Sequence, residues 1–378
     1  MRPQRTFPGR VGLQQRVLPT YRASFFDVLA ANCEGGLSIF AGSPRIDESI
    51  TTTDQLQVAH YARGRNHHFF DIVSPFYICW QGGLLRWLND WQPDILIVEA
   101  NPRYKSTQAA VEWMHRRNRL VIGWGLGAPP ISGLMTAWRK AERNRFLTSL
   151  DGFIAYSRRG AQEYHSTGLP PGRIFVALNA AAHRPTEPPP KRPPDKKGSL
   201  TVLFVGRLQA RKRIDLLLQA CSLLPQILRP RLWIVGDGPE RESLQDLAKS
   251  IYPSAEFPGS RTGPDLEPYF TGADLFVLPG TGGLAVQQAM AYGLPVIVAE
   301  GDGTQDDLVR ENNGWRIPPG DLTAMVEVLS DALSDVERLR CMGVESYRLV
   351  VEEVNLEAMV DVFIEALCSV TGHIDTEM

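Results

Sequence analysis

The sequence predicts an α/β protein with two domains, each built on a parallel β-sheet that helices cover. Short apolar runs alternate with amphipathic helical segments along most of the chain, which is the pattern of βαβ units. The 378 residues are enough for two domains of ordinary size. Residues 184–199 interrupt the alternation with a proline-rich, charged segment that predicts a semi-rigid linker. We therefore expect one domain over residues 1–183 and another over residues 200–354.

The first domain is expected to begin with a loose basic leader over residues 1–13. Apolar runs predict its strands at residues 15–18, 37–41, 94–98, 120–123, 152–156 and 174–178. Apolar residues at helical spacing predict its helices at residues 23–31, 106–118, 132–150 and 158–167. Between the second and third strands lie His60, His67 and His68. Metal chelation or base chemistry is one interpretation of these histidines. Exposed loop histidines are favoured, because no Glu or Cys stands at ligand spacing.

The second domain repeats the alternation. Its strands are predicted at residues 200–205, 231–235, 255–257, 275–278 and 295–298. Its helices are predicted at residues 213–224, 240–250, 265–273, 284–292, 322–333 and 336–350. A last helix is expected within residues 355–372.

Composition points to a soluble protein of the reducing cytosol. Hydrophobic residues make up 43% of the chain and charged residues 22%, as in ordinary globular proteins. The five cysteines are scattered without a Cys-x-x-Cys, so neither a disulfide framework nor a zinc site is expected. The N-terminus lacks the apolar segment of a signal peptide. No window approaches the roughly 18 apolar residues of a spanning helix.

The charge is divided unevenly along the chain. Residues 1–180 carry 21 Lys and Arg against 13 Asp and Glu, whereas the remainder carries 19 against 29. A basic first half predicts an anionic partner for that half. The expected helix at 132–150 mixes Leu134 and Trp138 with Arg139, Lys140, Arg143 and Arg145. Such a helix can lie on an anionic membrane surface. The alternative is an ordinary surface helix whose apolar stripe meets its own core.

The stretch from Pro279 to Val298 predicts an anion site. A buried strand ends at Leu278, the turn Pro279–Gly283 follows, and a helix begins at Leu284. Glycines allow the backbone to approach a ligand, and the N–H groups at a helix start favour phosphate. Gly293 stands where a left-handed C-cap would end the helix.

Two cations precede this stretch. Arg207 ends the first strand of the second half, and Lys212 follows one loop later. An arginine binds phosphate oxygens in bidentate fashion, and a lysine acts as a point charge. Each feature alone is more often structural or solvated. Their order along the chain makes a phosphate site the better interpretation, because Gly236-Asp237-Gly238-Pro239 and then the glycine turn follow these two cations.

This order resembles the nucleotide-sugar half of a family 4 glycosyltransferase with the two-domain GT-B fold. The matching segments are residues 205–212, 234–239, 257–259, 273–279, 288–296 and 312–315 with Asp321. The resemblance covers about residues 200–330. In the first half it is limited to the architecture and residues 18–26. It implies two Rossmann-like α/β domains facing across a cleft, with the last helix packed back on the first domain.

The resemblance also implies roles for single residues. Arg207 and Lys212 would hold the donor diphosphate and the charge that grows on it as the glycosidic bond breaks. The backbone N–H groups of Gly282, Gly283, Leu284 and Ala285 would face the same diphosphate. Other donor contacts are expected from Gly206, Asp237, Gln288 and the segment from Phe257 to Arg261, which would border the nucleobase. No cofactor and no metal are expected, because no Asp-x-Asp is present and cations already stand at the diphosphate.

Three positions depart from the family pattern. The family has two Glu eight positions apart across the glycine turn, and this chain has Gly280 and Gln288 there. Many members place a His where this chain has Trp124. These departures indicate either a divergent but active enzyme or one that has lost its activity. The presence of Arg207 and Lys212 favours the active enzyme.

The first half offers fewer candidates. Glu99 stands at a strand end and is its best catalytic carboxylate, the alternative being a buried or capping carboxylate beside Arg103. Tyr21 and Arg22 are candidates for acceptor contact. The resemblance therefore implies a cytosolic or membrane-peripheral glycosyltransferase that acts with retention on a nucleotide-diphosphate sugar. The basic half and the helix at 132–150 favour a glycan or lipid-linked acceptor, and no role for nucleic acid is expected. Rival hypotheses are a nucleotide-sugar-binding homologue or partner subunit without transfer, and an epimerase, which would need base chemistry that Gly280 and Gln288 do not supply.

Overall fold

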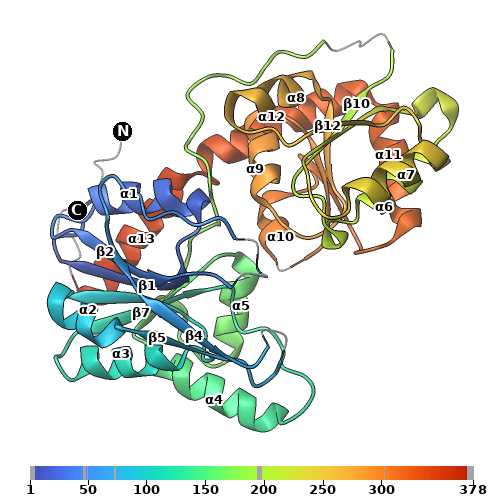
Figure 1. The fold of residues 1–378 in the computed structure, drawn as a ribbon. Helices are drawn as coiled ribbons and strands as arrows, with labels where there is room; N and C mark the ends of the chain where they lie inside the picture. The colour runs from blue at the N-terminus through green and yellow to red at the C-terminus, as the bar shows by residue number, and fades with distance from the viewer. Residues whose placement is uncertain are drawn as a thin grey trace. The chain divides into compact units, whose positions relative to one another are not determined.

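The computed structural model describes residues 5–45, 48, 50–71, 74–193, 198–301 and 303–372. The chain forms two compact units (Figure 1). The first unit takes in the chain up to Ala181 and again from Leu356, and the second takes in Ala182–Asn355. The chain therefore crosses between the units twice, once after Ala181 and once before Leu356.

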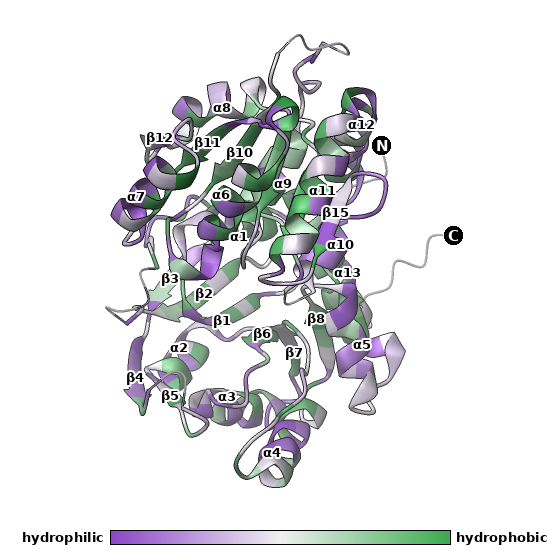
Figure 2. Cartoon of the chain, turned by 90° about the vertical axis from the view of Figure 1, so that its right-hand side faces the viewer, coloured by the Kyte–Doolittle hydropathy of each residue, from purple (hydrophilic) through white to green (hydrophobic). Residues whose placement is uncertain are grey.

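The first unit is built on a seven-stranded parallel sheet in the order β3-β2-β1-β6-β7-β8-β9. Its strands are β1 (Val11–Val17), β2 (Leu37–Gly42), β3 (His60–Arg63), β6 (Ile95–Glu99), β7 (Leu120–Gly125), β8 (Gly152–Ala155) and β9 (Ile174–Val176). Its helices are α1 (Ala23–Ala31), α2 (Leu84–Trp91), α3 (Lys105–His115), α4 (Thr136–Thr148), α5 (Arg158–Ser166) and α13 (Leu356–Thr371). Figure 2 shows inner strands such as β6 and β7 in the green of hydrophobic residues, as expected for strands covered on both faces.

The expected leader at residues 1–13 is wrong for its second half. Phe7 is 1% exposed and bridges Cys33, and β1 begins at Val11, four residues before the predicted start. β1 lies in the middle of the sheet between β2 and β6, so every one of its residues is buried. Gly12 hid this start from sequence reasoning, because glycine is disfavoured in strands.

The three histidines lie in strands rather than in a loop. His60 opens β3, and His67 and His68 belong to β4 (Arg65–Phe69). β4 pairs antiparallel with β5 (Ile78–Gly82) in a separate two-stranded sheet that was not predicted.

The last helix, α13, lies in the first unit. Phe363 on α13 meets the ring of Phe25 on α1 at a centroid distance of 5.0 Å and that of Trp124 at 5.1 Å. All three side chains are buried in one hydrophobic cluster. Trp124, at the position where many family members have a His, is thus part of the core.

The second unit carries a six-stranded parallel sheet in the order β12-β11-β10-β13-β14-β15. Its strands are β10 (Thr201–Val205), β11 (Arg231–Val235), β12 (Glu256–Gly259), β13 (Leu275–Leu278), β14 (Val296–Ala299) and β15 (Gly314–Ile317). Its helices are α6 (Ile214–Leu223), α7 (Arg241–Ile251), α8 (Glu267–Gly272), α9 (Leu284–Ala291), α10 (Thr304–Leu308), α11 (Leu322–Ser334) and α12 (Val336–Glu352). Gly293 follows α9 with φ +66°, the left-handed conformation expected of its C-cap position.

Residues 184–193, here called the strap, are bound to the second unit and are not a free spacer. The Arg192 guanidinium donates to the carbonyl oxygens of Ala273, Tyr292 and Phe270, each at 2.8 Å. The Tyr347 hydroxyl donates to the carbonyl oxygen of Glu187 at 2.7 Å. A proline-rich composition indicated stiffness, but hydrogen bonds from Arg192, Tyr347 and Arg340 hold the strap on the second unit.

Helix α4 begins four residues later than predicted, after Met135 in a left-handed conformation at φ +56°. Of its 13 residues only Phe146 and Leu147 are buried. Among the described residues, no helix combines the length and the apolar character that a membrane crossing requires.

Candidate functional site

A hollow of about 470 Å³ opens where the carboxyl ends of β10, β11 and β12 meet. Its lining comprises Val205, Gly206, Arg207, Val235, Gly236, Asp237, Gly238, Ser260 and Arg261. The structure therefore brings together four of the predicted donor-side residues, Gly206, Arg207, Asp237 and Arg261. Carboxyl ends of parallel strands are where open α/β sheets bind their ligands.

Close backbone contacts form the floor of this hollow. A Cβ on Gly236 would lie 1.9 Å from the carbonyl oxygen of Gly206, and one on Gly238 would lie 2.3 Å from that of Leu208. The Leu208 N–H also donates to the Asp237 carbonyl oxygen at 2.9 Å. Only glycine permits this approach, so the floor presents backbone to a ligand.

The charges around the hollow favour an anion. Arg207 and Arg261 are exposed, and among the described residues no carboxylate forms an ion pair with either. The Asp237 carboxylate instead accepts the Gly238 N–H at 2.7 Å and lies 3.7 Å from the guanidinium of Arg241. Arg241 also donates to the carbonyl oxygens of Gly236 and Phe257, which ties two of the loops together.

Lys212 reaches the glycine turn that follows β13. Its Nζ donates to the carbonyl oxygen of Thr281 at 2.6 Å, and the Thr281 N–H donates to the carbonyl oxygen of Arg211 at 3.1 Å. Burial, and then the like charge of Arg211, lowers the pKa of Lys212 to about 8. A half-buried ammonium that donates to the Thr281 carbonyl is the kind of group that a phosphate would stabilise.

The start of α9 supplies N–H donors beside Lys212. Gly283 precedes the helix without a side-chain cap, and the first N–H groups of a helix have no intrahelical partner. Gly282 has φ +125°, and a Cβ there would lie 2.2 Å from Lys212 Nζ. The predicted Gly282, Gly283, Leu284 and Ala285 therefore stand together with Lys212 after β13.

Gln305 is a part of this site that sequence reasoning missed. It is 2% exposed on α10, and its Nε2 donates to the carbonyl oxygen of Gly282 at 2.9 Å. Gln305 and Lys212 thus bind the carbonyl oxygens of two adjacent residues of the turn, Gly282 and Thr281. The sequence gave no sign of this role, because Gln305 is a single polar residue in α10, a short helix that was not predicted.

Gly280 has no room for a side chain. A Cβ there would lie 2.2 Å from the carbonyl oxygen of Arg211 and 2.6 Å from the carbonyl carbon of Lys212. Both atoms belong to the backbone of the 3-10 turn Ala210–Lys212. Gln288, the second departure, is half-buried on α9. The backbone of residues 211 and 212 thus fills the place of the expected carboxylate.

The residues that line the hollow and the residues around Lys212 lie at the same edge of one sheet, but they do not share one hollow. β10 and β13 are neighbours, so Arg207 and the glycine turn follow adjacent strands. Lys212 and Gly282 are not among the residues that line the 470 Å³ hollow.

In the first unit, Glu99 has a structural partner. Its Oε1 accepts the Arg16 N–H at 3.0 Å, and burial raises its pKa, opposed by that hydrogen bond and the charge of Arg16. The Arg16 guanidinium itself pairs with Glu48 at 2.8 Å. The predicted neighbour, Arg103, instead lies over the ring of Tyr77 at 5.3 Å. The capping interpretation of Glu99 fits this geometry, with Arg16 in the place of Arg103.

Arg22 is 4% exposed, which does not suit the predicted contact with an acceptor. Its guanidinium donates to Asn179 Oδ1 and lies over the rings of Trp124 at 5.2 Å and Tyr156 at 5.6 Å. It holds the segment that leaves the first unit. Tyr21 remains 47% exposed, with its ring 5.4 Å from Arg22.

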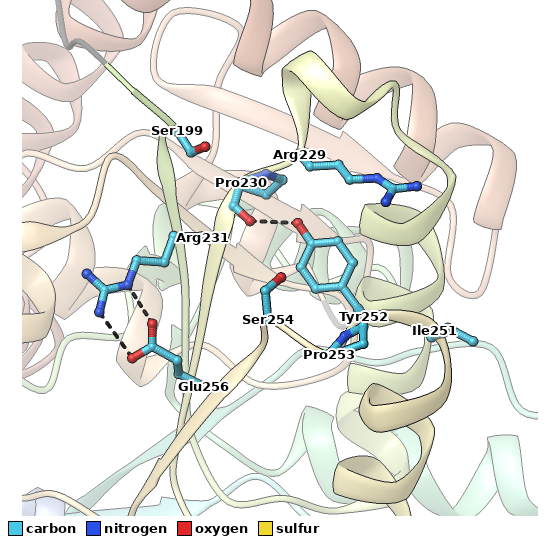
Figure 3. Close-up of a pocket in the computed structure, with 9 residues that line it drawn as sticks. All are labelled: Ser199, Arg229, Pro230, Arg231, Ile251, Tyr252, Pro253, Ser254 and Glu256. Atoms are coloured by element: carbon cyan, nitrogen blue, oxygen red, sulfur yellow. Dashed lines mark hydrogen bonds and ion pairs between the residues drawn. The ribbon is translucent and has the colours of Figure 1, made fainter.

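A second hollow, of about 350 Å³, lies at the opposite edge of the second sheet (Figure 3). It is lined by Ser199, Arg229, Pro230, Arg231, Ile251, Tyr252, Pro253, Ser254 and Glu256. Ser199 precedes β10 and Arg231 opens β11, so this is the amino edge. Arg231 pairs with Glu256 at 2.5 Å, and the Tyr252 hydroxyl donates to the Pro230 carbonyl oxygen at 2.6 Å. These polar groups satisfy one another and are remote from the glycine turns.

Comparison with known proteins points to one class of enzyme. The family model described as "Glycosyl transferases group 1" matches residues 199–335, all of which lie within the second unit. The sulfoquinovosyl transferase SQD2 of Arabidopsis thaliana is 33% identical over 148 residues, covering 38% of this chain and 28% of that protein. A GDP-mannose-dependent alpha-mannosyltransferase of Mycobacterium tuberculosis is 38% identical over 129 residues, covering 33% of this chain and 32% of that protein. The chain thus matches about a third of the length of these two relatives.

Similarity to solved structures extends over nearly the whole chain. HepE of Anabaena, solved in complex with UDP, superposes with a TM-score of 0.69 at 13% identity, covering 95% of this chain and 99% of that one. At this identity the likeness establishes the fold. The fold is GT-B, with two Rossmann-like α/β units, as the sequence predicted.

Proposed function

We propose that the protein is a family 4 glycosyltransferase that moves a sugar, with retention, from a nucleotide-diphosphate donor to a glycan or lipid-linked acceptor. The observation that carries the proposal is the edge of the second sheet. Within the part of the chain that the structure describes, neither Arg207 nor Arg261 is paired with a carboxylate there, and Lys212 meets the glycine turn at the start of α9. The group 1 match over residues 199–335 supports the same assignment.

The site suits the departure of a diphosphate. Negative charge on the diphosphate is largest when the glycosidic bond breaks, so cations and fixed N–H donors lower the barrier as well as bind the donor. Arg207, Lys212 and the N–H groups of Gly282–Ala285 supply that charge and those donors. We assign the acceptor's proton to the departing phosphate oxygen, which makes a separate general base unnecessary. Gly280 and Gln288, which cannot act as bases, are compatible with this route.

Binding can be tested before the acceptor is known. A thermal-shift screen with UDP-, GDP-, ADP- and dTDP-sugars is expected to select one nucleotide, since a ligand at 100 times its Kd adds about 2.7 kcal/mol to stability. Arg207→Ala and Lys212→Ala should each remove most of the shift and lower turnover by about 100-fold or more, the usual loss for one transition-state donor. Arg231→Ala, at the opposite edge of the sheet, is the matched control. Unchanged turnover in both site variants would refute the assigned roles.

A nucleotide-sugar-binding homologue without transfer is the second candidate. The observation that favours it is Gly280, where the structure leaves no room for a carboxylate. Donor hydrolysis separates the two candidates, because many transferases release the sugar to water slowly when no acceptor is present. A donor that binds but is neither hydrolysed nor transferred to a broad acceptor panel would favour the second.

We also propose that the enzyme acts at the cytoplasmic face of an anionic membrane, which α4 contacts. Trp138 on α4 is 54% exposed beside Arg139 and Lys140, and Leu134 and Met135, just before the helix, are 67% and 48% exposed. Exposed apolar side chains interspersed with cations are typical of helices that lie at a bilayer surface. The double variant Trp138→Ser, Lys140→Ser should reduce sedimentation with phosphatidylglycerol vesicles. Equal binding of both proteins would contradict the assignment.

A further inference from the structure

The β4–β5 hairpin of the first unit exposes an unusual number of aromatic rings. Phe69 is 53% exposed, Phe70 67%, Phe76 40% and Trp80 45%. Within the described ranges, no other phenylalanine is exposed to this degree. Exposed apolar side chains that gather in one place usually mark an interaction surface. Neither the candidate sugar-transfer site nor α4 includes these residues.

Phe70 is held outward at a cost in backbone conformation. Its φ is +66°, a left-handed conformation that bulky residues rarely adopt. Strain of this kind persists at sites where function requires a particular side-chain placement. The strained residue is thus also one of the most exposed aromatic side chains of the described residues.

The base of the hairpin is fixed by buried polar contacts. Gln81 is 1% exposed, and its Nε2 donates to the carbonyl oxygen of Gln15 and to Asn66 Oδ1, each at 2.9 Å. Asn66 Nδ2 in turn donates to the carbonyl oxygens of Arg16 and Ser43. The inner face of the hairpin is therefore committed to the first unit, and the outer face projects as a stiff element.

The outer face changes in polarity along the ladder. Phe69 faces Ile78 near the tip, His67 faces Trp80 in the middle, and Arg65 faces Gly82 at the base. At about 3.3 Å per residue, Phe69 and Arg65 are about 13 Å apart along the strand. Apolar rings, then tryptophan, then a cation is the order that a protein presents to acyl chains, interface and anionic headgroups.

The hairpin and α4 are connected through the start of α3. Cys79 on β5 bridges Tyr104, and the next residue, Lys105, forms an ion pair with Glu142 on α4. Trp138 lies one turn before Glu142 on that helix. The aromatic hairpin and the exposed part of α4 thus flank one helix of the same compact unit.

We propose that three described side chains at the apolar end of the β4–β5 hairpin, Phe69, Phe70 and Phe76, insert among the acyl chains in the interfacial layer of an anionic bilayer. Trp80 and Arg65 then stand at the headgroups. The phenylalanine rings carry no hydrogen-bonding groups, which a platform for a polar glycan would need beside its rings. The inference rests on the membrane location proposed above and does not depend on sugar transfer.

The test is vesicle binding by the full chain carrying Phe70→Ser and Phe76→Ser. Loss of two apolar contacts is expected to weaken binding to phosphatidylglycerol vesicles at least tenfold. Ile227→Ser, which changes a side chain 91% exposed on the second unit, is the matched control and should bind as the wild type does. Because both phenylalanines are exposed, the melting temperature should not fall.

A depth measurement gives a second readout. Phe70→Cys in a Cys341→Ser background, labelled with an environment-sensitive dye, should shift its emission to the blue on vesicle addition. Wild-type vesicle affinity in the double Ser variant, or an unshifted dye, would overturn the proposal. If the double Ser variant keeps its vesicle affinity but no longer forms a dimer in solution, the surface binds a second copy of the chain and the proposal is overturned. If it keeps its vesicle affinity but no longer binds a soluble glycan, the surface binds a glycan and the proposal is likewise overturned. Nucleotide-sugar binding by the double Ser variant should be normal, which separates a failure of this inference from a failure of the proposed enzyme.

Discussion

Replacing Gly280 by alanine is expected to displace the glycine turn from the loop that carries Lys212. The new Cβ would meet three backbone atoms at once, the Arg211 carbonyl oxygen at 2.2 Å and the Lys212 carbonyl carbon and Cα at 2.6 and 2.7 Å. Side chains can rotate away from such a contact, but backbone held by the Thr281 to Arg211 hydrogen bond cannot. One of the two segments must therefore move.

The size of the effect follows from the geometry. Overpacking in a well-packed region costs about 1–3 kcal/mol, and a collision with backbone belongs at the upper end. For a unit of this size about 3 kcal/mol corresponds to a fall of roughly 6–12 °C in the melting temperature of the second unit. If the turn moves, Lys212 also loses its carbonyl partner at Thr281. Loss of one transition-state donor costs about 2.7–4 kcal/mol, so kcat/KM should fall by about 100-fold to 1,000-fold.

Differential scanning fluorimetry and a nucleotide-release assay measure both effects. Gly280→Glu, which supplies the carboxylate of the family pattern, should lower stability and activity in the same way and should not improve turnover. Gly172→Ala is the control, because no atom lies within 4 Å of a Cβ there and its φ is not left-handed. Wild-type melting temperature and kcat/KM in Gly280→Ala would refute the steric account.

Three other changes have defined outcomes. Lys212 is charged below its pKa of about 8 and neutral above it, so kcat/KM for the donor should decline as pH rises through about 8. Arg211→Ala removes a like charge and should move this decline to higher pH. A pH profile that does not move in Arg211→Ala would count against the role assigned to Lys212. Arg192→Ala removes a charged donor from several carbonyl oxygens, and each hydrogen bond to a charged group contributes about 1.5–3 kcal/mol to stability. Limited proteolysis should therefore cut the strap faster in Arg192→Ala than in the control Lys191→Ala, which changes an exposed side chain. Gln305→Leu leaves the Gly282 carbonyl oxygen without its donor and should weaken the nucleotide-induced thermal shift, whereas an unchanged shift would show that Lys212 alone fixes the turn.

Buried parallel strands were predictable because they are continuous apolar runs. β6, β10, β13 and β14 were placed within one or two residues for this reason. Several strands that escaped prediction are not continuous apolar runs. β4 reads Arg65-Asn-His-His-Phe69 and has exposed alternate positions, and β15 carries Trp315 and Arg316. Their pairing depends on neighbours far along the chain, which periodicity does not report.

The candidate site was predictable where backbone geometry demands a residue type. Gly282 needs its positive φ, and Gly236 and Gly238 in the hollow need their close backbone contacts, so these positions can be recognised from composition and order. Arg22 and Glu99 show the limit of that reasoning. A strand-end residue can face a ligand or its own unit, and only the partners distinguish them. Arg22 donates to Asn179 and packs on aromatic rings, and Glu99 accepts the Arg16 N–H.

Gly280 gives the departure from the family pattern a physical meaning. From sequence alone, glycine in place of a carboxylate indicates a lost side chain, and an impaired enzyme follows naturally. In the structure the same glycine lets the backbone of residues 211 and 212 close onto the turn, and that closure brings Lys212 to within 2.6 Å of the Thr281 carbonyl oxygen. A carboxylate at position 280 and this placement of Lys212 exclude each other. The missing side chain is therefore a requirement of how the lysine is positioned, and the chain's departure at Gly280 argues for a rearranged site before it argues for a lost one.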